Sequence, residues 1–162
     1  MGVLSFVDDP TDGWVGEKSV GGVTDGGIIT LSPGADRTVQ DLQLRYSAQF
    51  VAGVAFGAVS VVDGDGNGYL VFLIDDDWGL RRLDAWVSHN ITTGKVTPVP
   101  TDGDWLTFTL NVENGGNVAM VIRDGKSNTT GAVLATGSAS DATYTLFDRI
   151  ATTGHAGPWR VD

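Results

Sequence analysis

The sequence predicts an all-β protein, an antiparallel two-sheet β-sandwich that occupies a single domain over residues 1–162. Three observations support this fold class. Residues 105–125 alternate apolar and polar side chains on either side of Asn114-Gly115, which is the strongest short-range signal for an antiparallel hairpin. The 23 glycines separate apolar runs, as turns do in a strand-rich chain. No window combines helical periodicity with capping residues, and many short strands at near-regular spacing are typical of a sandwich or barrel.

The expected strands follow one another along the chain, each bounded by turn signals. Residues 1–27 are expected to be an irregular start. Residues 54–62 are more uniformly apolar than the other strands, which is typical of a central strand covered on both faces. Residues 89–104 and the polar segment after Gly125 are expected to be loops. The full set of expected strands, chosen by their apolar or alternating runs, is 28–31, 42–51, 54–62, 69–74, 78–88, the two arms of 105–125, 144–152 and 159–162.

The chain is acidic and contains no cysteine. It carries 10 Lys and Arg against 20 Asp and Glu, which gives a formal net charge of −10. Such a surface repels phosphate, so neither nucleic acid nor an anionic membrane is an expected partner. Without cysteine there is no disulfide and no thiolate nucleophile or metal ligand. The start lacks the basic and apolar segments of a secretory signal. The expected location is extracellular or surface-exposed, either as a module of a larger exported protein or as a virion component.

Signatures of catalysis are weak. A retaining glycosidase needs two carboxyl groups about 5–5.5 Å apart. Glu17 and Glu113 are the only glutamates, so no strand carries a Glu-x-Asp-x-x-Glu motif. The two histidines, His89 and His155, accompany no Gly-x-Ser-x-Gly sequence. The sequence therefore predicts that the protein is not an enzyme.

Five segments occur in a characteristic order: FVDDPTDGW, DGDGNGYLVFLID, WLTFTLNVENGG, FDRIATTG and WRVD. Together they resemble the laminin-G-like and concanavalin-A-like jelly rolls of bacterial lectin and carbohydrate-binding domains, over almost the whole chain. The resemblance implies jelly-roll topology, a glycan or polysaccharide as partner, and often a structural calcium ion. Because such folds also include members that only scaffold or adhere, the alternative is a structural or assembly protein. Such a protein, for example a virion surface or tail component, would contact other protein subunits.

Two groups of acidic residues are candidate metal ligands. The segment DGDGNG, residues 63–68, begins like an EF-hand loop, but its twelfth position is Ile74 and its flanks are expected strands. A plain hairpin turn is the favoured interpretation. Asp9 and Asp12 near the start would meet Asp162 at the end if the first and last strands lie side by side, as in many jelly rolls. Clustered carboxylates repel unless a hard cation such as Ca²⁺ binds them. Solvated aspartates of ordinary turns are an equal alternative.

The expected strand 78–88 carries an unusual mixture on one face, where Arg82, Asp84 and Trp86 alternate with apolar neighbours. A cation, an anion and an indole suit a sugar, because the indole stacks on apolar C–H groups and the charged groups bind hydroxyls. Trp78, which follows an acidic turn, is a further candidate that would hold a ligand against its indole. The predicted ligand-binding residues are therefore Trp78, Arg82, Asp84 and Trp86. The alternative is a surface ion pair between Arg82 and Asp84, with Trp86 partly buried.

Overall fold

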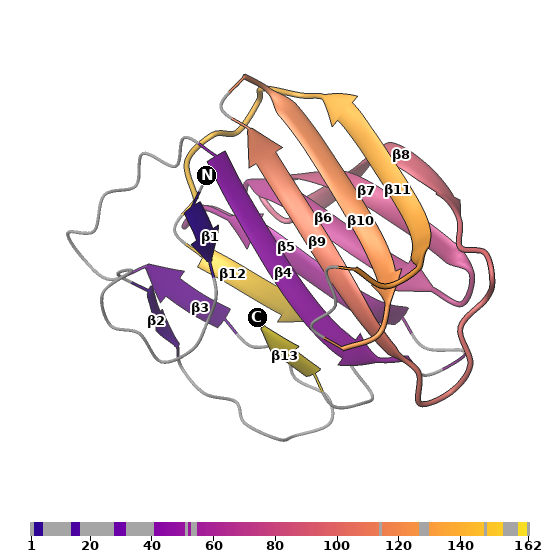
Figure 1. The fold of residues 1–162 in the computed structure, drawn as a ribbon. Coiled ribbons are helices and arrows are strands. Elements are labelled where there is room, and N and C mark those ends of the chain that lie inside the picture. The colour runs from indigo at the N-terminus through magenta and orange to yellow at the C-terminus, as the bar shows by residue number, and fades with distance from the viewer. Residues whose placement is uncertain are drawn as a thin grey trace.

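The computed structural model describes residues 2–4, 14–16, 28–31, 41–50, 52, 55–113, 115–126, 130–147, 149–153 and 159–161. Within these ranges the strands β1 to β13 form two sheets that pack face to face (Figure 1). The predicted all-β sandwich is confirmed. Among the described residues, no helix is long and apolar enough to cross a membrane.

The first sheet has six strands and contains both ends of the described chain. Its strands in spatial order are β1 (Gly2–Leu4), β4 (Asp41–Gln49), β9 (Trp105–Glu113), β10 (Asn117–Asp124) and β11 (Val133–Ser140), with β13 (Trp159–Val161) also paired to β4. Strand β1 runs parallel to β4 and pairs with residues 42–44, whereas β13 runs antiparallel and pairs with residues 46–48. Because β9 occupies the other edge of β4, β1 and β13 lie along one edge (Figure 1).

The second sheet has seven strands, and all its neighbours are antiparallel. Its strands in spatial order are β2 (Trp14–Gly16), β3 (Ile28–Leu31), β12 (Arg149–Thr153), β5 (Ala55–Val62), β6 (Gly68–Ile74), β7 (Asp77–Asp84) and β8 (Val87–Lys95). The late strand β12 lies between the early strands β3 and β5, so the chain returns from the six-stranded sheet to the seven-stranded sheet after β11. The long hairpins β5–β6–β7–β8 form the side of the sheet that carries the candidate site.

The core lies between the sheets and follows the alternation of the sequence. In β9, Leu106, Phe108 and Leu110 are buried, as the hairpin pattern predicts. In β6, Tyr69 and Val71 are buried against them from the opposite sheet. Each large apolar side chain removed from water stabilises the fold by about 1.5–3 kcal/mol. The alternating residues of the hairpin therefore account for one wall of the core.

The structure corrects four of the expected elements. The expected strand 78–88 ends at Asp84, because the chain turns at residues 85–86. Residues 89–104 were expected to be a loop, but the first part of that segment completes β8. The polar segment after Gly125 likewise contains β11. Both β8 and β11 are last in their sheets, and an edge strand exposed to water needs few apolar residues. Residues 144–147, expected to be strand, pass over the core without joining either sheet.

The predicted calcium ligands Asp9, Asp12 and Asp162 lie outside the described residues, so that site stays a prediction. Within the described part of the chain, no group of three or more His, Asp or Glu could hold a metal ion. The first and last strands, β1 and β13, share one edge of β4, whereas β2, which begins two residues after Asp12, belongs to the other sheet.

If calcium joins the two ends, the melting temperature should rise in millimolar CaCl₂ and fall in excess chelator, because a ligand that binds only the folded state stabilises it by mass action. Differential scanning fluorimetry measures both shifts, with MgCl₂ as the control for ionic strength. A melting temperature that changes with neither addition would contradict a calcium site at these residues.

Candidate functional site

The candidate site lies where the inner face of the seven-stranded sheet reaches solvent. Tyr69 of β6, Arg82 of β7 and His89 of β8 are directly opposite one another in the strand register. Residues directly opposite on antiparallel strands share one face of a sheet. Tyr69 is fully buried in the core, whereas the side chain of Arg82 is 33% exposed and that of His89 is 50% exposed. The same row of side chains therefore runs from the core to the surface.

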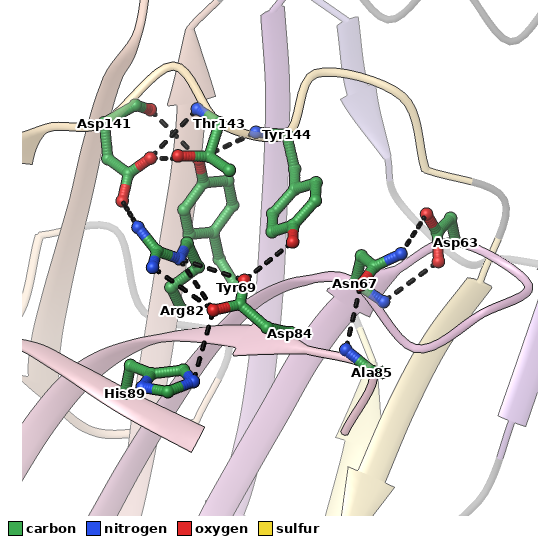
Figure 2. Close-up of polar contacts among 10 residues, drawn as sticks. All are labelled: Asp63, Asn67, Tyr69, Arg82, Asp84, Ala85, His89, Asp141, Thr143 and Tyr144. Carbon is green, nitrogen blue, oxygen red and sulfur yellow. Dashed lines mark hydrogen bonds and ion pairs between the residues drawn. The ribbon is translucent and has the colours of Figure 1, made fainter. Parts of the chain in front are cut away.

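A segment that follows the last strand of the other sheet lies over this row. After β11 the chain passes through residues 141–147, and Asp141, Thr143 and Tyr144 lie beside these side chains (Figure 2). The hydroxyl of Tyr69 lies 3.0 Å from the carbonyl oxygen and 3.1 Å from Oδ1 of Asp141, and it accepts a hydrogen bond from the backbone N–H of Tyr144 at 3.3 Å. The ring of Phe147 packs edge-on against that of Tyr69, with 6.0 Å between the ring centroids. Burial raises the pKa of Tyr69 to about 12, so this hydroxyl stays protonated and structural.

Arg82 and Asp84 form the charged centre of the site. Arg82 donates from Nε to Asp84 Oδ1 at 3.0 Å and from Nη2 to Asp84 Oδ2 at 3.2 Å, while its Nη1 reaches Asp141 Oδ2 at 3.4 Å (Figure 2). Asp84 also accepts a hydrogen bond from the Tyr144 hydroxyl at 2.6 Å and lies 3.2 Å from His89 Nε2. The end cluster is the set Tyr69, Arg82, Asp84, His89, Asp141 and Tyr144. Its charged groups are fixed by one another before any ligand arrives.

The two carboxylates of the end cluster are stabilised in their ionised form. The hydrogen bond from Tyr144 and the contacts with Arg82 lower the pKa of Asp84. Burial acts to raise the pKa of Asp141, but hydrogen bonds from Thr143 and Tyr69 outweigh it and the pKa is lowered overall. Both groups are therefore charged at neutral pH.

Acid should weaken this end of the fold. A carboxylate whose folded pKa lies below its unfolded value, near 4, stabilises the fold fully above that value. The stabilisation is lost as the pH falls through the folded pKa. We expect the melting temperature to fall between about pH 5 and about pH 2 at constant ionic strength. Asp141→Asn should melt earlier at pH 7 and show a shallower fall. Equal slopes for the variant and the wild type would contradict this role of Asp141.

Trp86 stands beside the end cluster at the tip of the β7–β8 hairpin. The residue is 51% exposed. Ala85 and Trp86 have φ angles of 50° and 66°, in the left-handed region that residues with a Cβ rarely occupy. The turn between β5 and β6 holds them: the N–H of Ala85 donates to Asn67 Oδ1 at 2.8 Å, and the N–H of Trp86 donates to the carbonyl of Gly66 at 2.9 Å.

The turn between β5 and β6 is the DGDGNG segment, and its hairpin interpretation is confirmed by the strands on both sides. The carboxylate of Asp63 accepts hydrogen bonds from the N–H of Asp65 at 2.9 Å and of Asn67 at 2.9 Å, and from Asn67 Nδ2 at 3.0 Å. Asp63 therefore folds its own loop. The amide of Asn67 then links this loop to the next hairpin (Figure 2).

The structure pairs two of the four predicted ligand-binding residues, Arg82 and Asp84, within the end cluster. Trp86 follows Asp84 by two residues, at the hairpin tip, and contacts the turn between β5 and β6. Trp78 does not join them, because it lies at the opposite end of β7, about 20 Å from Asp84 along an extended strand. It is only 7% exposed, and its Nε1 donates to the carbonyl of Lys95 at 3.3 Å. Its ring is part of the core and is not available to a ligand.

Sequence reasoning missed four of the six residues of the end cluster. His89 was placed in an expected loop, and it would have been recognised only if β8 had been. Asp141 and Tyr144 lie about sixty to seventy residues from their partners, and the local pattern around them carries no signal of that contact. Tyr69 was assigned to a strand, which is correct, without any role.

Comparison with protein-family models and with curated proteins finds no match. Comparison with solved structures does. The carbohydrate-binding module CBM66 from Bacillus subtilis covers 99% of this chain and 95% of its own, with a TM-score of 0.57 and 14% sequence identity. A protein of unknown function from Shewanella oneidensis has a TM-score of 0.52 at 8% identity, over 86% of this chain and 62% of its own.

The third likeness is to a much longer chain. The receptor-binding domain of the botulinum neurotoxin C/D mosaic serotype has a TM-score of 0.50 and 9% identity, and the match covers 83% of this chain but only 35% of the toxin chain. At these identities the likeness shows the fold. That fold is shared with a carbohydrate-binding module.

Proposed function

We propose that this protein is a non-catalytic glycan-binding module and that the glycan binds over Trp86 and the end cluster. The observation that carries the proposal is that Trp86, half exposed at the tip of the β7–β8 hairpin, lies two residues beyond Asp84, which is paired with Arg82. An indole supplies a flat apolar surface for the C–H groups of a sugar and loses little side-chain entropy on binding. The carboxylate of Asp84 and the imidazole of His89, which remain accessible, supply hydrogen-bonding partners for hydroxyls.

The charges of the end cluster favour a neutral glycan. All three guanidinium nitrogens of Arg82 already contact Asp84 or Asp141, so an acidic sugar would have to displace a carboxylate to reach this cation. The chain as a whole carries a net charge of −10 and repels anions. The hydroxyls of a neutral sugar, in contrast, can donate to carboxylates that stay ionised at neutral pH.

The same carboxylates support a binding role without catalysis. Glycoside hydrolysis requires one protonated carboxyl group that donates to the leaving oxygen. In the end cluster the pKa values of Asp84 and Asp141 are both lowered, so neither group is a general acid at neutral pH.

The solved structures also favour glycan binding over an assembly role, because the likeness that covers nearly the whole chain is to a carbohydrate-binding module. A protein with this function is expected to act outside the cytoplasm, on extracellular or surface-exposed glycans.

An oligosaccharide array tests the proposal. It should carry neutral, sialylated and uronic-acid glycans, and the wild type and Trp86→Ala should be applied in parallel at the same concentration. We expect the wild type to bind at least one neutral glycan, without turnover, and the variant to lose that binding. The proposal would be overturned if the wild type bound no neutral glycan on the array. It would also be overturned if Trp86→Ala bound the same neutral glycan as well as the wild type does.

A further inference from the structure

We propose that the support turn, defined as Asp63–Asn67, positions the indole of Trp86 for its ligand, and that Gly66 is the positioning residue because its missing side chain makes room for the indole. This inference rests on the proposed function, since it assigns a role within the same site. It also assigns the DGDGNG segment a structural role, although its sequence begins like a metal-binding loop.

The indole of Trp86 lies directly on the backbone of Gly66. A Cβ built on Gly66 would stand 2.2 Å from Nε1 of Trp86 and 2.4 Å from both Cδ1 and Cε2. Carbon atoms in van der Waals contact are about 3.5–4.0 Å apart, so a side chain at this position and the observed indole exclude one another. The five-membered ring thus rests on the peptide with one face covered. The residue nevertheless stays 51% exposed, which leaves surface for a ligand.

The backbone of the hairpin tip is fixed by the same turn. The N–H of Trp86 donates to the carbonyl of Gly66, and the N–H of Ala85 donates to the side chain of Asn67. Asp63 in turn holds both the backbone and the side-chain amide of Asn67 (Figure 2). The position of Trp86 is therefore set by its own backbone, by the residue before it and by the surface under its ring.

This arrangement explains why two residues with side chains occupy the left-handed region. Such a conformation persists only where the surroundings over-determine it, and it gathers at binding sites. Two-residue hairpins of this geometry favour Asn-Gly, yet here they contain Ala85 and Trp86. The support turn covers one face of the aromatic side chain at the tip and fixes its position, while Trp86 stays half exposed. A ligand that stacks on it does not have to order it, which raises affinity by pre-organisation.

Gly66→Ala tests the inference, and Gly103→Ala is its matched control. Gly66 has a φ of +83° and Gly103 a φ of +91°, so alanine meets the same backbone penalty at both positions. A Cβ on Gly103 would meet nothing within 4 Å, whereas on Gly66 it would meet the indole. Gly103→Ala therefore controls for the backbone penalty, and the difference between the two variants reports on the space around Gly66, where the three nearest atoms all belong to the indole.

The first measurement needs no ligand. In spectra of protein labelled with ¹⁵N, the Trp86 indole N–H is assigned by its loss in Trp86→Phe. We expect it to be rigid in the wild type and in Gly103→Ala. In Gly66→Ala it should shift and become mobile. Asn67→Ala should act in the same direction more weakly, and it provides a second variant if Gly66→Ala does not fold. An indole signal that is the same in Gly66→Ala and the wild type would overturn the inference.

The second measurement is affinity for the neutral oligosaccharide that the wild type binds most tightly on the array. Gly66→Ala should lose about tenfold or more in affinity, while Gly103→Ala keeps that of the wild type. Unchanged affinity with a displaced indole would overturn the role of Gly66 in binding but leave the glycan site intact. A wild type that binds no glycan, with the indole still displaced by Gly66→Ala, would instead refute the proposed function and retain the steric role of Gly66.

Discussion

Trp86→Ala should lower the affinity for a neutral glycan by about 2 kcal/mol or more, as the loss of an aromatic anchor does at other interfaces. The indole is half exposed, so its removal takes away a surface for the ligand and little of the core. The melting temperature should therefore change only slightly. Isothermal titration calorimetry with the array's best neutral oligosaccharide measures the first quantity, and differential scanning calorimetry the second.

Val99→Ala provides the control for that experiment. Val99 is also exposed, at 55%, but it lies outside the end cluster, so its truncation should change neither affinity nor stability. Trp86→Phe should fall between the wild type and alanine, because it keeps a smaller stacking surface. The alternative interpretation of Trp86, as a residue that mainly packs, makes the opposite forecast: a sharp fall in melting temperature with affinity unchanged. That pair of results would rule out the indole as a ligand platform.

Trp78→Ala should destabilise the fold by about 3–5 kcal/mol, the usual range for a buried tryptophan truncated to alanine. The ring is fitted between glycines on two sheets: a Cβ on Gly94 or on Gly137 would each come within 2.7 Å of it. Alanine would leave a cavity there and remove the hydrogen bond from Nε1 to Lys95. Because small domains have a total stability of about 5–15 kcal/mol, this substitution should remove a large part of the free energy of unfolding. Urea denaturation followed by far-UV circular dichroism measures the loss.

Trp78→Phe separates packing from hydrogen bonding, since it refills most of the cavity without the N–H. Its loss of stability should be clearly smaller than that of alanine. The folded fraction of Trp78→Ala should still bind glycan, because the ring does not reach the end cluster. A Trp78→Ala protein as stable as the wild type would show that the ring is not part of the core.

The elements that the sequence predicts well are those under strong apolar constraint. The hairpin 105–125 alternates because one face of each strand meets the core, and the structure places its arms in β9 and β10. The edge strands β8 and β11 escaped prediction, because a strand that faces water on one side and has no neighbour at one edge can be polar throughout. The turn at Ala85 and Trp86 escaped as well, since neither residue is a usual signal for that turn.

The candidate site shows the same division. Arg82 and Asp84 were found because both lie on one strand, two residues apart, where the alternation places them on one face. Tyr144 and Asp141 reach them from a segment about sixty residues away, and no local pattern reports such a contact. Trp86 was selected by its spacing on a strand that does not continue so far. Its exposure comes from the turn that interrupts that strand.

The shared edge of β4 has a consequence for how the chain can be rewired. Val161 of β13 lies opposite Tyr46, and Gly2 of β1 lies opposite Leu42, which is four residues along the same strand, or about 13 Å. A short linker can span that gap and join the two ends. New ends can then be opened at the exposed residues 101–103, between β8 and β9. Every described strand pair would survive this circular permutation, and β6, β7, β8 and residues 141–147 would carry the end cluster into the permuted protein unbroken.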